Sequence, residues 1–168
     1  MTHRLSTSEL LGQLVNSRVV VVDVRPSAAF NGWTLPGEVR GGHIPGALNV
    51  PLAWTGVGKD REIRALLIAK GITPDKTVIV YGSSHHPADA MAARLQRLGY
   101  EEVRIYGDGP TTWTADARVP LEGLVHYQQL VPPSWLYGLL GGRYSGTCAN
   151  VAVQYGRRSP KTSRQAGL

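Results

Sequence analysis

Three short apolar runs constrain the fold of this chain more than any other feature. The first, residues 19–24, reads Val-Val-Val-Val-Asp-Val and shows no alternation of apolar and polar side chains. Such a run is typical of a strand that is covered on both faces, as in a parallel sheet. Residues 78–81 and 103–106 form two further runs of the same kind, with helical patterns between them. The sequence therefore predicts an α/β fold with a central parallel sheet flanked by helices.

The helices are predicted from their caps and apolar faces. Ser6 and Glu9 have the spacing of a capping box in front of a first short helix. Asp60 is expected to cap a second helix, which carries Ile63, Leu66 and Leu67 and ends at Gly71. Two more helices are expected to begin after the later strands, near Ala88 and around residues 111–113.

The positive charge is concentrated at one end of the chain. The net charge is +6, yet residues 1–130 hold 13 basic and 12 acidic side chains, whereas residues 131–168 hold five basic ones and no acid. This C-terminal stretch lacks the interleaved aromatic side chains and the recognition element of a nucleic-acid binder. We therefore expect residues 143–168 to form a basic, disordered tail, and we do not expect nucleic acid to be a partner.

Other classes of protein are excluded by composition. The single cysteine, Cys148, cannot form an internal disulfide or supply a zinc site that needs several cysteines. No apolar run reaches the roughly 18 residues that span a bilayer, so we expect no membrane partner. His85 and His86 are adjacent, and no carboxylate lies at ligand spacing from them, so neither a metal nor a cofactor is expected.

The segment after the second run is the candidate binding site. In an open α/β sheet, ligands bind beyond the carboxyl ends of the strands. A loop that leads into a helix N-terminus can direct its backbone N–H groups at a small oxyanion, with His86 as the first choice of side-chain donor. The alternative interpretation is a plain connector with two solvated histidines. The residues of this candidate loop are Gly82, Ser83, Ser84, His85, His86 and Pro87.

Further motifs resemble a known family. Asp23 and Arg25 end the first run, and residues 42–51 read Gly-His-Ile-Pro-Gly-Ala-Leu-Asn-Val-Pro. Together with residues 71–81 and the Leu-Gly-Tyr sequence at 98–100, they resemble the signatures of rhodanese-like domains. The resemblance implies a three-layer α/β fold and the transfer of sulfur from thiosulfate. We interpret the motif residues as structural, the pair at the strand end fixing loops by hydrogen bonds; they are Asp23, Arg25, Gly42, His43, Pro45 and Gly46.

One position departs from that family where its chemistry takes place. The residue after the tyrosine of the second run is usually the catalytic cysteine, and the 18-residue interval from Gly82 to Tyr100 matches the usual spacing. Glycine has no thiolate that could hold a persulfide, and Cys148 lies outside every motif. The expected function is therefore a non-catalytic, anion-binding domain that is a regulatory or structural partner of a sulfurtransferase domain. The alternative is a thiosulfate sulfurtransferase in its full-length tandem form.

The resemblance also suggests how the chain is organised. We expect a rhodanese-like domain over residues 1–125, and a linker with the start of a following rhodanese-like domain over residues 126–142. The second domain's own strand ending in Asp-x-Arg is missing, so we expect a truncated tandem protein whose N-terminal domain is degenerate. Its partner would be a catalytic rhodanese domain or a sulfur-carrying protein. No secretory signal opens the sequence, which favours the cytoplasm as written, or the periplasm for a piece of an exported protein.

An insertion separates two of the family motifs. Residues 31–41 lie where typical single-domain members have only a residue or two. Trp33 in this insertion either covers the pocket or faces a partner domain, and the sequence leaves both alternatives open.

Overall fold

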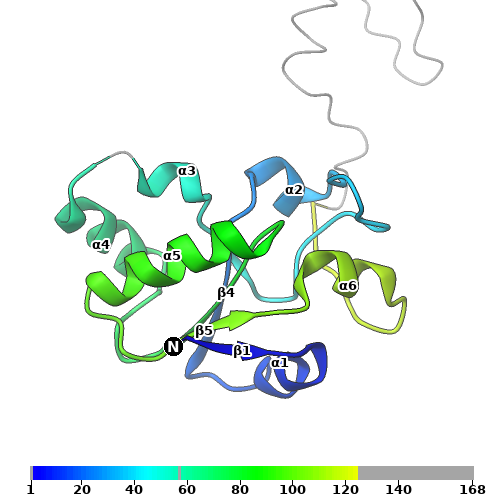
Figure 1. Cartoon of the computed structure of the whole chain (residues 1–168), viewed down its shortest axis with the longest axis horizontal. Helices are drawn as coiled ribbons and strands as arrows, with labels where there is room; N and C mark the ends of the chain where they lie inside the picture. Colours follow the sequence, from blue (N-terminus) through cyan, green and yellow to red (C-terminus); the bar gives the residue numbers. More distant parts are fainter. Residues whose placement is uncertain (1, 57, 125–168) are drawn as a thin grey trace, which may run out of the picture. The chain divides into compact units, whose positions relative to one another are not determined.

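A computed structural model describes residues 2–56 and 58–124 of the chain (Figure 1). The chain divides into two units, Met1–Leu130 and Val131–Leu168, and all the described residues belong to the first. The expectations for residues 126–142 and 143–168 therefore lie outside the described residues. Within the described residues, no helix is long and apolar enough to cross a membrane.

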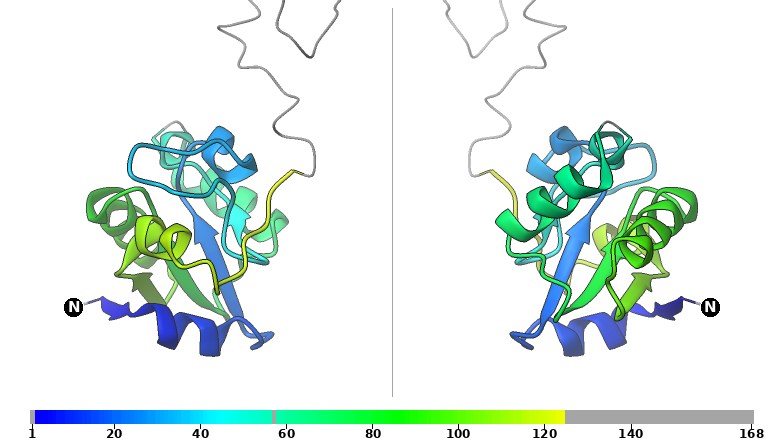
Figure 2. Two further views of the ribbon diagram at one scale, coloured as in Figure 1. Left: turned by 90° about the vertical axis from the view of Figure 1, so that its right-hand side faces the viewer. Right: turned by 90° about the vertical axis from the view of Figure 1, so that its left-hand side faces the viewer.

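The core of the fold is a parallel sheet of five strands in the order β1-β5-β4-β2-β3. The three predicted runs form its centre, and helices cover both faces (Figures 1 and 2). This confirms the predicted α/β architecture. The two edge strands were not predicted, because each has only two or three residues. The strands are β1 (His3–Leu5), β2 (Val19–Asp23), β3 (Leu48–Asn49), β4 (Thr77–Tyr81) and β5 (Val103–Tyr106).

The helices complete three layers. Alternate residues of each strand point to opposite faces, so Val80 packs with one group of helices and Ile79 with the other. The first group is α3, α4 and α5, and the second is α1 and α6, with Phe30 of α2 packed beside them. The helices are α1 (Thr7–Gln13), α2 (Ser27–Asn31), α3 (Leu52–Thr55), α4 (Asp60–Ala69), α5 (His85–Arg97) and α6 (Gly109–Ala115).

The predicted start of α1 and the glycines expected to end two helices are confirmed, whereas α6 begins at Gly109, before the expected residues 111–113. The Ser6 side chain accepts from the backbone N–H of Glu9, while the Glu9 carboxylate accepts from the backbone N–H of Ser6, forming the expected capping box of α1. Gly71 and Gly99, at φ +80° and +88°, end α4 and α5 in the left-handed conformation that glycine adopts without steric cost.

One expectation for α4 was wrong. The N-cap residue is Lys59 rather than Asp60, and its backbone N–H is bonded by the Glu62 carboxylate at 3.0 Å. Leu66 is 37% exposed, and the buried stripe is carried by Ile63 and Leu67.

The start of α5 was also predicted too late. The helix begins at His85, three residues before Ala88, so the second half of the candidate loop is its first turn. Pro87 was taken as the end of the loop, but proline is tolerated here because N–H groups of a first helical turn have no intrahelical partner. The true connection is consequently short and holds Gly82, Ser83 and Ser84.

Candidate functional site

The connection between β4 and α5 lies at the carboxyl end of the sheet. Gly82 is buried, whereas Ser83, Ser84, His85 and His86 are exposed. Ser84 is the N-cap residue and has an extended backbone, with φ −152° and ψ 178°, but its side chain makes no capping hydrogen bond. The first backbone N–H groups of α5 are thus not capped by their own N-cap side chain, and the helix dipole adds positive potential there.

A hollow of about 220 Å³ opens beside this connection. Its walls come from the segments that follow β4 and β5, two neighbouring strands of the sheet. His85 belongs to the lining, whereas His86, the first choice from the sequence, does not. We call this space the loop hollow; it is lined by Gly82, Ser83, Ser84, His85, Tyr106, Gly107, Asp108, Gly109, Pro110 and Thr111.

His85 is part of a small surface cluster. Arg4 of β1 donates to both carboxylate oxygens of Asp89, at 2.8 and 3.0 Å, and its other terminal nitrogen lies 3.4 Å from His85 Nδ1. Because Arg4 and Asp89 are about half exposed, this ion pair contributes little to stability. It does place a cationic group next to the histidine that lines the loop hollow.

A second hollow borders the same connection and shares Ser83 with the loop hollow. It has a volume of about 400 Å³ and includes Ser83 and Pro87 together with Trp54, which is 46% exposed. The rest of its wall comes from the segment that follows β2 and from the start of α3, and most of these side chains are apolar. These residues are Val24, Arg25, Pro26, Ser27, Pro51, Leu52 and Ala53.

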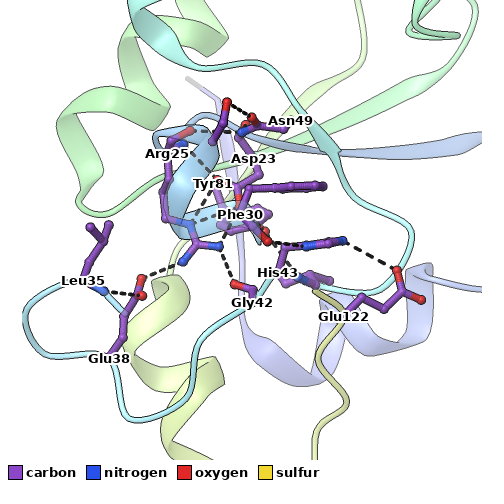
Figure 3. A network of polar contacts seen from close by, with 12 residues as sticks. Asp23, Arg25, Phe30, Leu35, Glu38, Gly42, His43, Asn49, Tyr81 and Glu122 are labelled. Carbon is purple, nitrogen blue, oxygen red and sulfur yellow. Dashed lines mark hydrogen bonds and ion pairs between the residues drawn. The ribbon is translucent and has the colours of Figure 1, made fainter. Parts of the chain in front are cut away.

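The motif residues Asp23 and Arg25 form a buried network at the end of β2 (Figure 3). Arg25 donates to the Asp23 carboxylate from Nε and from a terminal nitrogen, the latter at 2.7 Å. Its other contacts are the Gly42 carbonyl at 2.8 Å and the Glu38 carboxylate at 2.6 Å. The Tyr81 hydroxyl donates to Asp23 at 2.7 Å. Arg25 thus joins the end of β2 to the segment that contains Glu38 and Gly42.

Electrostatics keep this network charged. Burial acts to lower the pKa of Arg25, but the hydrogen bonds and charge of Asp23 outweigh it and raise that pKa above its ordinary value. Burial, followed by the Asp23 charge, raises the pKa of Tyr81 well above 10. Arg25 therefore stays cationic and Tyr81 stays protonated at neutral pH. These contacts are those of a structural pair that fixes loops.

Glu38 was not identified from the sequence, although it completes this network. It belongs to the insertion, is buried at its carboxylate, and also accepts from the backbone N–H of Leu35 at 2.9 Å. An acidic residue near a buried arginine was the available signal, but the sequence does not show that residues 25 and 38 meet. Trp33 of the same insertion is half-buried and lines neither hollow.

Arg40, near the C-terminal end of the insertion, forms hydrogen bonds to the end of α6. Arg40 donates from its side chain to the backbone carbonyls of Trp113 and Thr114, and to those of Asp116 and Val119 beyond the helix. Cations are favourable at a helix C-terminus, where the last carbonyls lack partners. The insertion thus fixes α6, whose first residues line the loop hollow.

The glycine-rich motif that begins at Gly42 is fixed by His43. Its ring stacks on Phe30 with centroids 3.6 Å apart, and its Nδ1 lies 2.7 Å from the Phe30 carbonyl oxygen (Figure 3). Its backbone pairs with Glu122, whose carboxylate also accepts from the backbone N–H of Gly46 at 2.9 Å. Half-buried Pro45 lies between these two contacts in the sequence. His43 and Gly46 are thus held by Phe30 and Glu122, and neither of them lines the loop hollow.

The described residues contain no group of three or more His, Cys, Asp and Glu side chains that could hold a metal ion. The groups that line the loop hollow are backbone N–H groups, hydroxyls, the imidazole of His85 and the carboxylate of Asp108.

Comparisons with known proteins agree with this architecture. The chain is 31% identical to thiosulfate sulfurtransferase YnjE of Escherichia coli over 133 residues, which cover 79% of this chain and 29% of the relative. It is 35% identical to 3-mercaptopyruvate sulfurtransferase of the same species, over 61% of this chain and 38% of the relative.

A solved structure agrees as well. The anaerobic ergothioneine biosynthesis enzyme from Chlorobium limicola, in complex with trimethyl histidine, superposes with a TM-score of 0.74 at 33% identity, covering 88% of this chain and 34% of that one. The chain thus spans about a third of the length of these relatives. The family model for the rhodanese-like domain matches residues 6–116, and the chain belongs to this family.

Proposed function

We propose that this domain does not itself carry sulfur. In this proposal it binds a small oxyanion in the loop hollow and acts as a regulatory or structural partner of a catalytic sulfurtransferase domain. The observation that carries the proposal is Gly82, which directly follows β4, where the family resemblance puts the nucleophilic cysteine. Sulfur transfer through a persulfide needs a thiolate at that point, and glycine offers no atom for it.

The packing around Gly82 supports the same proposal. A Cβ atom at this position would lie 2.9 Å from Cγ2 of Val24 and 3.2 Å from Cβ of Pro87. Both neighbours are stiff side chains, so accommodating a larger residue requires them to shift. The neighbourhood is packed around a residue without a side chain.

Oxyanion binding is supported by the donors that converge on the loop hollow. The N-terminus of the 13-residue helix α5 contributes backbone N–H groups and the positive end of its dipole. Ser83 and Ser84 add hydroxyls, and His85 adds a ring next to the Arg4 guanidinium. A volume of about 220 Å³ admits an anion of the size of sulfate or thiosulfate.

Arg25 does not compete for this ligand. Its side chain is buried and donates to Asp23, Glu38 and a backbone carbonyl. The anion is therefore held by the loop and the start of α5, without the arginine of the strand motif.

The alternative function is that of a thiosulfate sulfurtransferase in a longer tandem protein. It is favoured by the names of the relatives, a thiosulfate sulfurtransferase and a 3-mercaptopyruvate sulfurtransferase, and by the chain spanning about a third of their length. In that case activity resides in a second rhodanese-like domain, and this domain contributes contacts to it. A sulfur-carrying protein is the other partner that this chemistry suits.

A thiosulfate:cyanide assay on the full chain tests the first proposal. We expect no thiocyanate formation above background, both for the unaltered chain and for Cys148→Ser, which removes the only thiol. Turnover that survives Cys148→Ser contradicts the proposal, since no sulfur nucleophile of this chain could then explain it. Turnover that Cys148→Ser abolishes would assign the chemistry to that cysteine instead.

Restoring the nucleophile gives a sharper test. Gly82→Cys alone should lower the free energy of unfolding because of the contacts with Val24 and Pro87, and adding Val24→Ala should recover part of the loss. In the double variant, the helix N-terminus should hold the pKa of the new thiol below the ordinary value of about 8.5, as measured by the pH dependence of alkylation. A thiol of ordinary pKa would contradict the proposed anion-stabilising loop.

A further inference from the structure

The lining of the loop hollow includes a carboxylate, which should repel an anion. Asp108 follows β5 and is the N-cap residue of α6. An aspartate at this position usually accepts from the backbone of its own helix, but the Asp108 side chain makes no such capping bond. Its carboxylate is bound elsewhere.

Thr7, the first residue of α1, holds this carboxylate. The Thr7 backbone N–H and hydroxyl both bond the same oxygen, Asp108 Oδ2, with heavy-atom distances of 2.7 and 2.8 Å. Thr7 does not line the loop hollow; it lines a separate hollow of about 540 Å³ beside α1, which Asp108 also borders. The bonded oxygen is thus turned toward α1.

The direction of the hydrogen bonds in this cluster is determined by charge. A carboxylate only accepts, so the Thr7 hydroxyl donates to Asp108. The Thr7 oxygen lies 2.8 Å from the Tyr106 hydroxyl, which must then be the donor to Thr7. Burial raises the pKa of Tyr106 to about 12, so it keeps its proton at neutral pH. Tyr106 also lines the loop hollow, and its proton points to Thr7.

We propose that Thr7 is a positioning residue for the anion site: it draws the Asp108 carboxylate away from the loop hollow and so preserves the positive potential of the α5 N-terminus there. This inference rests on the proposed oxyanion site. The Thr7 hydroxyl acts through Asp108 and does not touch the ligand.

Calorimetric titration of the full chain with inorganic sulfate, and separately with thiosulfate, tests the inference. Thr7→Val keeps the shape of the side chain and removes the hydroxyl, so that only the Thr7 backbone N–H still bonds Asp108 Oδ2. The less firmly held carboxylate should then weaken sulfate binding roughly three- to tenfold, because like charges repel each other across a few ångströms. Thr7→Ser keeps the hydroxyl and should bind sulfate as the unaltered chain does.

A double-mutant cycle separates this effect from a change in folding. Asp108→Asn and Thr7→Val/Asp108→Asn should bind sulfate equally well, because the Thr7 hydroxyl matters only while residue 108 is charged. If the double variant binds as weakly as Thr7→Val alone, the inference is wrong and the loss is structural. Thermal unfolding is followed for each variant, and Thr7→Ala, which only removes atoms, replaces the valine if that variant does not fold.

The failures of the two proposals can be told apart. If the unaltered chain binds neither sulfate nor thiosulfate, the anion site itself is wrong, and the inference is overturned with it. If the unaltered chain binds and Thr7→Val binds equally well, the anion site stands and only the role of Thr7 is overturned.

Discussion

Two neighbouring strands of the sheet end in opposite ways. Asp23 at the end of β2 pairs in register with Tyr81 at the end of β4. Beyond β2, the polar groups of Asp23 and Arg25 are buried and bound to each other, to Glu38 and to the backbone. Beyond β4, Ser83 and Ser84 are exposed beside a hollow. The same edge of the sheet thus contains one site that stabilises the domain and one that is open to a ligand.

The difference shows why a charged residue at a strand end is not in itself evidence of a binding site. Arg25 has the side chain best suited to an anion, but its donors are directed at protein acceptors. The loop after β4 has no charged side chain at positions 82–84, but its three residues line the loop hollow, and Ser83 and Ser84 are exposed. Availability of the donors, rather than charge, separates the two regions.

The largest effect on the free energy of unfolding is expected when the buried network beyond β2 loses Arg25. We call this network the buried region, and the loop after β4 with its hollow the open region. Arg25→Met leaves the carboxylates of Asp23 and Glu38 buried without their cation, which should lower the free energy of unfolding by about 3–5 kcal/mol. The matched change beyond β4, Ser83→Ala, should alter it by less than about 0.5 kcal/mol. Urea unfolding followed by circular dichroism measures both free energies. Equal losses in the two variants would show that the region beyond β2 contributes no more to stability than the loop beyond β4.

A smaller loss of stability is expected at alkaline pH, where the buried tyrosines Tyr81 and Tyr106 begin to matter. Burial raises the pKa of Tyr106 to about 12 and that of Tyr81 well above 10, whereas unfolded tyrosines ionise near about 10. The unfolded chain therefore releases these protons first, so stability is full below pH 10 and falls as the pH rises toward 12.

The urea midpoint measured between pH 8 and pH 11.5 checks this, with Tyr106→Phe as the control that should lose less stability over the same range. The part of the effect that remains in Tyr106→Phe is due to Tyr81, which donates to Asp23, and this part reports on the buried network of Asp23 and Arg25. A midpoint that is flat above pH 10 would speak against buried, protonated phenols.

The smallest effect is expected at the open region. If sulfate binds there with a dissociation constant of about 10 mM, 50 mM sulfate raises the free energy of unfolding by about 1 kcal/mol. Sodium chloride at matched ionic strength controls for the screening of charges by salt. The stabilisation should be specific to the oxyanion; an equal increase with chloride would assign it to general salt effects.

The centre of the fold was predictable from the sequence because its signals are local. The unbroken valines of β2 indicate burial on both faces, and the capping box of α1 needs only residues 6 and 9. The edge strands β1 and β3 were not predicted, since two or three residues carry no periodicity. Pro87 hid the true start of α5, because a proline within the first turn and a proline in a loop look alike in the sequence.

The candidate site was predictable only in its location. Gly82 and the loop after β4 were identified from the motif order, and the structure shows a hollow beside them. The contacts that orient the surroundings join residues far apart in the chain, such as Thr7 with Asp108 and Arg25 with Glu38. Without tertiary structure nothing marks these pairs, so Glu38 and Thr7 were missed.

The position of β1 has a consequence for how the domain is made on the ribosome. His3 pairs in register with Arg104, so β1 is synthesised about 100 residues before the strand with which it pairs. In the sheet, β5 lies between β1 and β4. The sheet is therefore incomplete until β5 has left the exit tunnel, and until then the edge of β4 that pairs with β5 stays unpaired. Such non-local pairing slows folding and exposes a strand edge to other chains. Completion of this domain is thus a late event in its translation, set by residues 103–106 rather than by the helices made before them.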